Sequence, residues 1–197
     1  MTTPVLKNES LLYPQSAFAS WKKGDYSFLT KSVASDYIKK ILVKKAQERP
    51  GKRFFGEAYI ASQSAMREGW YNSFKWLTGG KWLTGNGLKP EFERPFHEAL
   101  MKYFGFDMLR NLQDKAKIFY ENHESELEAK KPVAPDLLMI KENGDFQFVE
   151  SKLPGDTIRP SQIAGMALIK KYLNPQGSVE VSVCNLHPDG GGAVAVD

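Results

Sequence analysis

The stretch 133–165, VAPDLLMIKENGDFQFVESKLPGDTIRPSQIAG, decides how the second half of this chain folds. It holds two apolar runs separated by Asn143-Gly144, a pair that is typical of a hairpin turn. Asp136 begins the first run, and Glu150 and Lys152 end the second. Because burying an unpartnered charge is costly, charges at the ends of two apolar strands indicate a shared polar site.

The length of the turn determines whether these charges meet. A strict two-residue turn would place Asp136 opposite Ser151, on the wrong face of the hairpin, because a shift of one residue exchanges the faces. A three-residue loop over 142–144, with Gly144 left-handed, places Asp136 opposite Glu150 instead. A site on one face therefore predicts the longer, bulged turn or an irregularity near Asp136.

Two carboxylates beside a lysine have the chemistry of a magnesium site. Magnesium prefers oxygen ligands and is commonly held by one or two carboxylates and several waters. A metal activates water and shields a phosphate, and a lysine stabilises the phosphate oxygens, so the pattern favours phosphodiester hydrolysis. Structural alternatives stay open, since Asp136 could shape a turn after Pro135 and Glu150 could form a simple surface ion pair with Lys152.

The segment resembles the PD-(D/E)xK nuclease superfamily through Pro135-Asp136 and Glu150-Ser151-Lys152. It is most similar to the virus-type replication-repair nuclease (VRR-NUC) branch. In that branch a strand with glutamate-x-lysine precedes a Gly-Asp turn and a helix that opens with Pro-x-Gln. Gly155-Asp156 and Pro160-Ser161-Gln162 stand at those positions here, and the resemblance covers residues 133 to 186.

The resemblance implies a metal-dependent DNA nuclease with a restriction-endonuclease-like core. The metal ligands would be Asp136, Glu150 and the backbone carbonyl of Ser151, with Mg²⁺ as the cofactor and Mn²⁺ as a substitute. Lys152 would be the catalytic lysine, and Gln162 would reach the site from the following helix. Standalone members of such families are often dimers, so a homodimer is expected.

The family also has a first-helix glutamate that contributes to catalysis and metal binding. Glu57 in GEAYIASQ fits that position, and Glu98 is the alternative. The chain departs from the commoner pattern at Ser151, where a valine is usual, and at Arg159, where a capping serine or threonine is expected. The second change loses a cap worth about 1 kcal/mol but places a positive charge near a bound phosphate.

A basic segment, 31–53, precedes these motifs, and the formal net charge is +4. It is interpreted either as a surface that contacts DNA phosphates, with salt-sensitive and largely sequence-independent binding, or as a solvated helix face. The residues expected to contact nucleic acid are Lys39, Lys40, Lys44, Lys45, Lys52, Arg53 and Arg159.

Composition sets further limits on the class of protein. The chain has 197 residues, of which 42% are hydrophobic and 25% charged, as in ordinary globular domains. A lone cysteine excludes an intrachain disulfide and a multi-cysteine zinc site, and the three histidines show no ligand spacing. With no membrane span, secretory leader or nucleotide-binding loop in sight, we expect an intracellular, cytoplasmic protein without a nucleotide cofactor.

The expected fold is α/β (α+β), a small mixed sheet flanked by helices. Three segments are predicted: an N-terminal basic, helical extension over 1–50, a nuclease domain over 51–188 with a helical insertion around 91–130, and a flexible tail over 189–197. Residues 1–30 are expected to be irregular. Helices are predicted at 35–48, 56–68, 91–104, 109–129 and from Pro160, and a last strand at 178–186.

The pentamer KWLTG occurs twice, at 75–79 and 81–85. Its tryptophans, Trp76 and Trp82, could stack on DNA bases, but we favour a core position for at least one of them. The leading functional hypothesis is a nuclease selective for branched, flap or junction DNA in replication and repair. The alternatives are a catalytically silent nucleic-acid-binding module and a restriction-type endonuclease.

Overall fold

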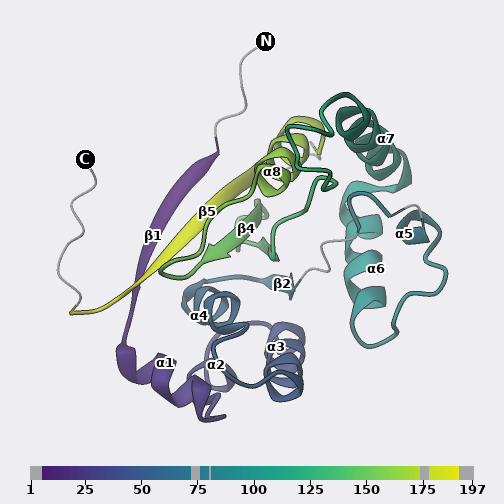
Figure 1. Ribbon diagram of the computed structural model, residues 1–197. Coiled ribbons are helices and arrows are strands. Elements are labelled where there is room, and N and C mark those ends of the chain that lie inside the picture. The colour runs from purple at the N-terminus through teal and green to yellow at the C-terminus, as the bar shows by residue number, and fades with distance from the viewer. Residues whose placement is uncertain (1–5, 72–75, 80, 174–177, 191–197) are drawn as a thin grey trace.

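A mixed sheet lies at the centre of the protein, with helices on both of its faces (Figure 1). The computed structural model describes residues 6–71, 76–79, 81–173 and 178–190. Within these residues the sheet has five strands in the order β1-β5-β4-β3-β2. The strands are β1 (Lys7–Tyr13), β2 (Glu68–Tyr71), β3 (Leu137–Ile140), β4 (Phe146–Lys152) and β5 (Val179–Pro188). The mixed sheet flanked by helices confirms the predicted fold class.

Strand direction divides the sheet into two parts. β1, β5 and β4 run parallel to one another, whereas β3 is antiparallel to both of its neighbours, β4 and β2. Parallel strands need a crossover connection, and α8 (Pro160–Tyr172) supplies it between β4 and β5. The ends of β4 and β5 therefore meet at one edge of the sheet, beside the first turn of α8.

Alternation along the strands creates one hydrophobic core on each face. The first, here called the α4-side core, contains Leu137 and Val149 and is covered by the four N-terminal helices. The second, the α8-side core, contains Leu138 and Phe148. The helices over the first core are α1 (Gln15–Lys22), α2 (Ser27–Thr30), α3 (Asp36–Glu48) and α4 (Phe55–Gln63). The other helices are α5 (Lys81–Thr84), α6 (Glu93–Phe104), α7 (Phe106–Asn122) and α8.

The β3–β4 hairpin has the predicted register. Leu137 pairs with Val149 and Ile140 pairs with Phe146, so the same register continued by one residue sets Asp136 opposite Glu150. The loop between the strands is the three-residue one, 142–144. The N–H of Lys141 donates to the carbonyl of Asp145 at 2.9 Å, and Gly144 has a φ of +91°. The bulged turn is therefore confirmed.

Several other local predictions are confirmed. Ser35 precedes α3, and its hydroxyl accepts the N–H of Ile38 at 3.4 Å. α6 ends at Gly105, α8 begins at Pro160, and the last strand begins at Val179. These elements follow local signals, caps and breakers, which do not depend on distant contacts.

The prediction of irregular structure over 1–30 is wrong for most of the described residues, and residues 1–5 lie outside them. Residues 7–13 form β1, and residues 15–22 and 27–30 form α1 and α2. β1 pairs in parallel with β5, which lies far away in the sequence. The segment around Leu11 and Tyr13 therefore becomes a strand because of a non-local partner, which its short apolar pattern does not reveal. Residues 7–13 thus belong to the central sheet, and α3 shares the α4-side core with Val149 of β4.

Two helix boundaries also differ from expectation. The helix predicted over 56–68 ends at Gln63, and Glu68 begins β2. Gly69, the residue just after the predicted helix, lies in β2, where a Cβ would come within 2.7 Å of the side chain of Ile38. A glycine after a helical pattern resembles a helix stop, but here it lies in a strand and allows α3 to pack closely against that strand. The helix predicted over 109–129 runs from Phe106 to Asn122.

Both tryptophans of the repeated pentamer are core residues. Trp76 is 1% exposed and Trp82 is 6% exposed, and both pack against Phe96. The core interpretation is confirmed, and the DNA-stacking hypothesis is wrong for both. Lys75 and the side chain of Lys81 lie outside the described residues, as does most of the predicted tail, 191–197. Cys184 is buried, and no helix in the described part of the chain is long and apolar enough to cross a membrane.

Candidate active site

The ends of four elements meet at the sheet edge where β4 finishes. β4 contributes Glu150 and Lys152, and the residue before β3 contributes Asp136. The first turn of α4 contributes Glu57, and the first turn of α8 contributes Gln162. The structure therefore brings together the five side chains that the sequence singled out.

Glu150, Lys152 and Gln162 form a buried hydrogen-bonded cluster. The Nζ of Lys152 lies 2.8 Å from Oε1 of Glu150 and 3.1 Å from Oε1 of Gln162. The amide Nε2 of Gln162 also donates to Oε1 of Glu150. The three residues are only 3%, 8% and 5% exposed. The lysine is therefore held in one position by two acceptors, and the exposed surface-pair alternative is wrong.

The start of α8 packs against and hydrogen-bonds to the segment that precedes β3. The N–H of Val133 donates to the carbonyl of Ser161 at 2.8 Å. A Cβ at Gly165 would come within 1.9 Å of the Val133 carbonyl oxygen, so only glycine permits this approach. The side chain of Gln162 also accepts the N–H of Arg159 at 3.1 Å, which joins the first turn of the helix to the residue before Pro160. The APD and RPSQIAG motifs are thus parts of one packed unit.

Asp136 and Glu57 face a hollow on the α4 side of the sheet edge. Ser151 donates its N–H to Oδ2 of Asp136 at 3.3 Å, which orients that carboxylate. Glu57, Asp136 and Ser151 all line the hollow, which has a volume of about 340 Å³. α4 comes close to β4 because Gly56 lacks a side chain, since a Cβ there would lie 2.9 Å from the Ser151 hydroxyl. The small Ser151, in place of the usual valine, suits this contact.

Burial is the main cause of a raised pKa at all three carboxylates. Burial raises the pKa of Asp136 well above its usual range, and the charges of Glu150 and Glu57 raise it further. Burial also raises the pKa of Glu57 to about 7, with Glu150 adding to the rise. Burial raises the pKa of Glu150 too, although Lys152 donates to it and opposes the shift. Because the charge of Glu150 helps to raise the pKa of both Asp136 and Glu57, a cation bound between these carboxylates would favour their ionised forms.

The donor set fits a magnesium ion that keeps part of its hydration shell. Among the described residues, no group of three or more His, Cys, Asp or Glu side chains is placed to hold a metal ion. Magnesium does not need one, because one or two carboxylates and several waters are its usual ligands. Asp136 and Glu57 line one hollow and supply such a pair. The role of the Ser151 carbonyl stays a prediction.

The alternatives for the first-helix acid are separated by position. Glu57 lies in the hollow, whereas Glu98 is exposed on α6 and is not among the lining residues. Asp156 shapes the turn after β4, because its Oδ2 accepts the N–H of Leu153 at 3.1 Å. It also lies on the rim of the hollow. Glu57 is therefore the acid that the geometry supports.

The predicted DNA-binding residues divide into two groups. Lys52 and Arg53 line the hollow beside the carboxylates, and Arg159 is close enough to lower the pKa of Glu150. The lysines of α3 are directed elsewhere. Lys44 pairs with Glu91 at 2.5 Å, Lys39 lies 3.8 Å from Asp36, and the Nζ of Lys45 lies 3.9 Å from the ring centre of Phe92. Lys40 is exposed on α3 and is not among the residues that line the hollow.

Arg49 was missing from the predicted site residues. It follows α3 and lines the hollow with Lys52 and Arg53. The available signal was its place in the short segment between two predicted helices, where three cations, Arg49, Lys52 and Arg53, flank Gly51. Helical periodicity drew attention to the lysines of α3 instead, whereas the connecting loop is the part that approaches the site.

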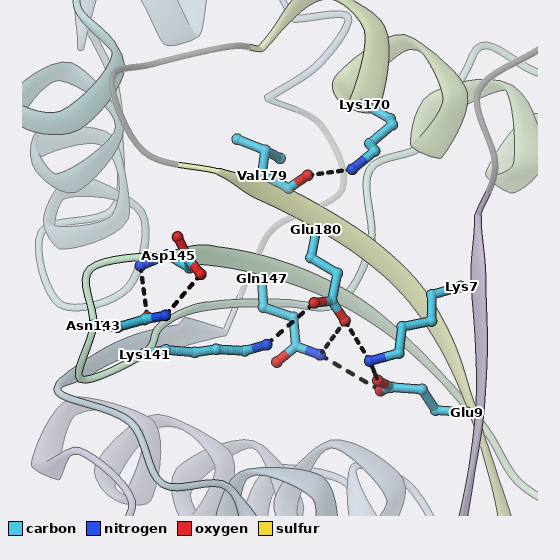
Figure 2. Close-up of polar contacts among 9 residues, drawn as sticks. All are labelled: Lys7, Glu9, Lys141, Asn143, Asp145, Gln147, Lys170, Val179 and Glu180. Atoms are coloured by element: carbon cyan, nitrogen blue, oxygen red, sulfur yellow. Dashed lines mark hydrogen bonds and ion pairs between the residues drawn. The ribbon is translucent and has the colours of Figure 1, made fainter. Parts of the chain in front are cut away.

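A second polar cluster lies towards the other ends of β4 and β5 (Figure 2). Lys7 contacts Glu180 at 2.9 Å and Glu9 at 2.6 Å, and Lys141 contacts Glu180 at 3.2 Å. Gln147 donates to Glu180 at 3.4 Å. Here two lysines balance two glutamates, so this cluster joins strands across the sheet.

No protein-family model matches the chain, and no curated protein matches it either.

Proposed function

We propose that the protein is a metal-dependent DNA nuclease that hydrolyses phosphodiester bonds. The observation that carries the proposal is the meeting of Asp136 and Glu57 in one hollow beside the buried cluster of Glu150, Lys152 and Gln162. A small mixed sheet flanked by helices is also the fold that the resemblance to PD-(D/E)xK nucleases implies.

Asp136 and Glu57 would hold Mg²⁺, or Mn²⁺ in its place, with Glu150 and the Ser151 carbonyl as further ligands. When bound, such an ion lowers the pKa of a coordinated water and shields the charge of a phosphate. The residues of the chain position the reacting groups. Glu150 and Gln162 restrain Lys152 through two hydrogen bonds, so that its amino group is in place to donate to a phosphate oxygen or to the attacking water.

The basic rim supports DNA as the substrate. Arg49, Lys52 and Arg53 are exposed on one side of the hollow, and phosphate contacts of this kind give binding that depends on salt and little on sequence. A structure-selective role on branched, flap or junction DNA in replication or repair, and action as a homodimer, follow from the resemblance and belong to the proposal.

A cleavage assay tests the proposal. Labelled single-stranded, duplex, flap, fork and four-way-junction DNA is incubated with wild type and with Lys152→Ala, in magnesium, manganese or chelator. We expect cleavage that needs metal and falls at least about 100-fold in the variant. Lys117→Ala is the matched control, because this lysine is 76% exposed on α7. Its activity should equal that of wild type.

Two outcomes would point elsewhere. Equal DNA binding by wild type and Lys152→Ala, with no cleavage of any substrate and no magnesium binding in a calorimetric titration, would favour the binding-module alternative. Cleavage of duplex DNA at one defined sequence would favour a restriction-type endonuclease.

A further inference from the structure

A second hollow opens beside Lys152, on the other face of the sheet edge. Ser151 and Lys152 are neighbours on β4, so their side chains point to opposite faces. Ser151 lines the hollow that contains Asp136, and Lys152 lines the second one, which has a volume of about 320 Å³. Asp156 lies on the rim of both. The candidate catalytic centre therefore lies between two hollows that meet at the end of β4.

The two hollows differ in chemistry. The first carries the cations Arg49, Lys52 and Arg53. The second is lined by the charged residues Lys7, Lys152 and Asp156, and its other lining residues are uncharged. Among these, Leu6, Ile158 and Val183 are aliphatic, and two are asparagines. A polyanionic backbone suits the first hollow. The second, with its aliphatic groups and its two amides, suits a flat group with hydrogen-bonding edges.

The amides of the second hollow, Asn8 and Asn185, are paired with each other. Nδ2 of Asn185 donates to Oδ1 of Asn8 at 2.6 Å. Within the described part of the chain, the remaining atoms, Nδ2 of Asn8 and Oδ1 of Asn185, have no hydrogen-bond partner. One donor and one acceptor of the paired amides thus stay available to a ligand. Asparagine amides recognise the edges of nucleobases with this combination.

We propose that this second hollow binds one unpaired nucleobase of the substrate strand, next to the phosphate that is cleaved. The inference rests on the proposed nuclease function and names the substrate class of that site, single-stranded DNA or the unpaired part of a branched DNA. The backbone lies along Arg49, Lys52 and Arg53, crosses the end of β4 beside Lys152, and delivers the next base to Asn8 and Asn185. A base within a duplex is stacked and paired, so it cannot enter without being extruded.

Abasic substitution tests the base-binding step in the active enzyme. A single abasic site is moved along a single-stranded substrate, one position at a time. We expect a loss of cleavage of roughly 5- to 100-fold at one position beside the cut, since that base no longer contributes binding energy. Asn185→Leu should lose cleavage of the intact strand by a similar factor. Combining this variant with that abasic site should cause little further loss, as expected for two changes that remove one interaction.

Gln63→Leu is the matched control, because Gln63 is an exposed amide at the far end of α4. It should show the full abasic effect. Less than a twofold effect at every abasic position in the wild type would overturn the proposal. Independent, multiplicative losses for Asn185→Leu and the abasic site would overturn it as well.

A binding measurement separates this proposal from the nuclease proposal. Single-stranded DNA carrying 2-aminopurine at successive positions is titrated with protein in chelator, where no cleavage occurs. We expect a change in fluorescence at one position that is lost in Asn185→Leu and kept in Gln63→Leu. A position-specific change without any metal-dependent cleavage would retain the base site and remove the nuclease function. Metal-dependent cleavage with the same fluorescence response at every position would retain the nuclease function and remove the base site.

Discussion

Glu57 shows how much a single residue depends on its surroundings. In the sequence it is an acid at the start of a helix, where it complements the helix dipole. In the fold it lies beside Asp136 in a hollow close to Glu150, and its pKa rises to about 7, first through burial and then through the Glu150 charge. A side chain that is unremarkable in the chain thus becomes an acid that resists ionisation in the absence of metal.

Glu57→Gln should change how stability depends on pH in chelator. The folded pKa of Glu57, about 7, exceeds its ordinary value of 4.5. Its contribution to stability is therefore present below pH 4.5 and is lost as the pH rises to about 7. The free energy of unfolding of wild type minus that of Glu57→Gln should fall by about 1–3 kcal/mol over this range, measured by urea denaturation. A flat difference would contradict the burial of this carboxylate.

Magnesium should reverse that loss at pH 7.5. A cation that binds the folded state alone stabilises it by mass action, by about 2.7 kcal/mol when its concentration is 100 times the dissociation constant. We expect saturating magnesium to raise the melting temperature of wild type by several degrees. Asp136→Asn should show little of this rise, and an equal rise in both proteins would place the metal elsewhere.

At the scale of elements, the β3–β4 hairpin and α8 determine the geometry of the site. The hairpin register places Asp136 opposite Glu150, and α8 brings Gln162 to Lys152. The hairpin register and the position of α8 each depend on one glycine. Gly144 adopts the left-handed conformation of the three-residue loop, and Gly165 permits contact between α8 and the segment before β3.

Gly144→Ala should destabilise the protein by about 1 kcal/mol, because an L-residue with a side chain is strained at a φ of +91°. Gly144→Asn should cost less, since asparagine tolerates left-handed conformations better than most residues. Chemical denaturation of both variants measures the difference. Equal costs would mean that backbone conformation at this position is not what limits the turn.

Gly165→Ala should be far more damaging. The added methyl group would overlap the backbone of Val133, which is not free to rotate away as a side chain is. We expect a loss of roughly 2–4 kcal/mol, at or above the usual range for overpacking. Ile163→Ala, on the same helix but 43% exposed, should cost less than about 1 kcal/mol. A mild effect of Gly165→Ala would show that α8 and this segment are not held together.

For the whole molecule, the pairing of β1 with β5 joins the two ends of the described chain in one sheet. A protein beginning at residue 14 would lose β1 and remove the buried Tyr13 from the α4-side core. We expect it to aggregate or to unfold at a clearly lower temperature, since the edge of β5 becomes exposed. If residues 1–50 were a separate extension, this truncation would leave the melting temperature almost unchanged. Thermal unfolding of the two proteins decides between these views.

The sequence by itself determined the features that arise from local signals and short-range geometry. Ser35, Gly105 and Pro160 mark the ends of helices, and alternation around the three-residue loop sets the hairpin register. These features depend on residues that are near one another in the chain, so a local pattern is sufficient to predict them.

Only the tertiary structure decided which distant residues belong to the site and which only pack. It selected Glu57 over Glu98 and directed Arg49 rather than Lys45 to the hollow. It also made β1 a strand of the central sheet. The physical reason is the same in each case. Burial, charge balance and strand pairing depend on partners that are remote in sequence, and the local pattern around a residue does not identify those partners.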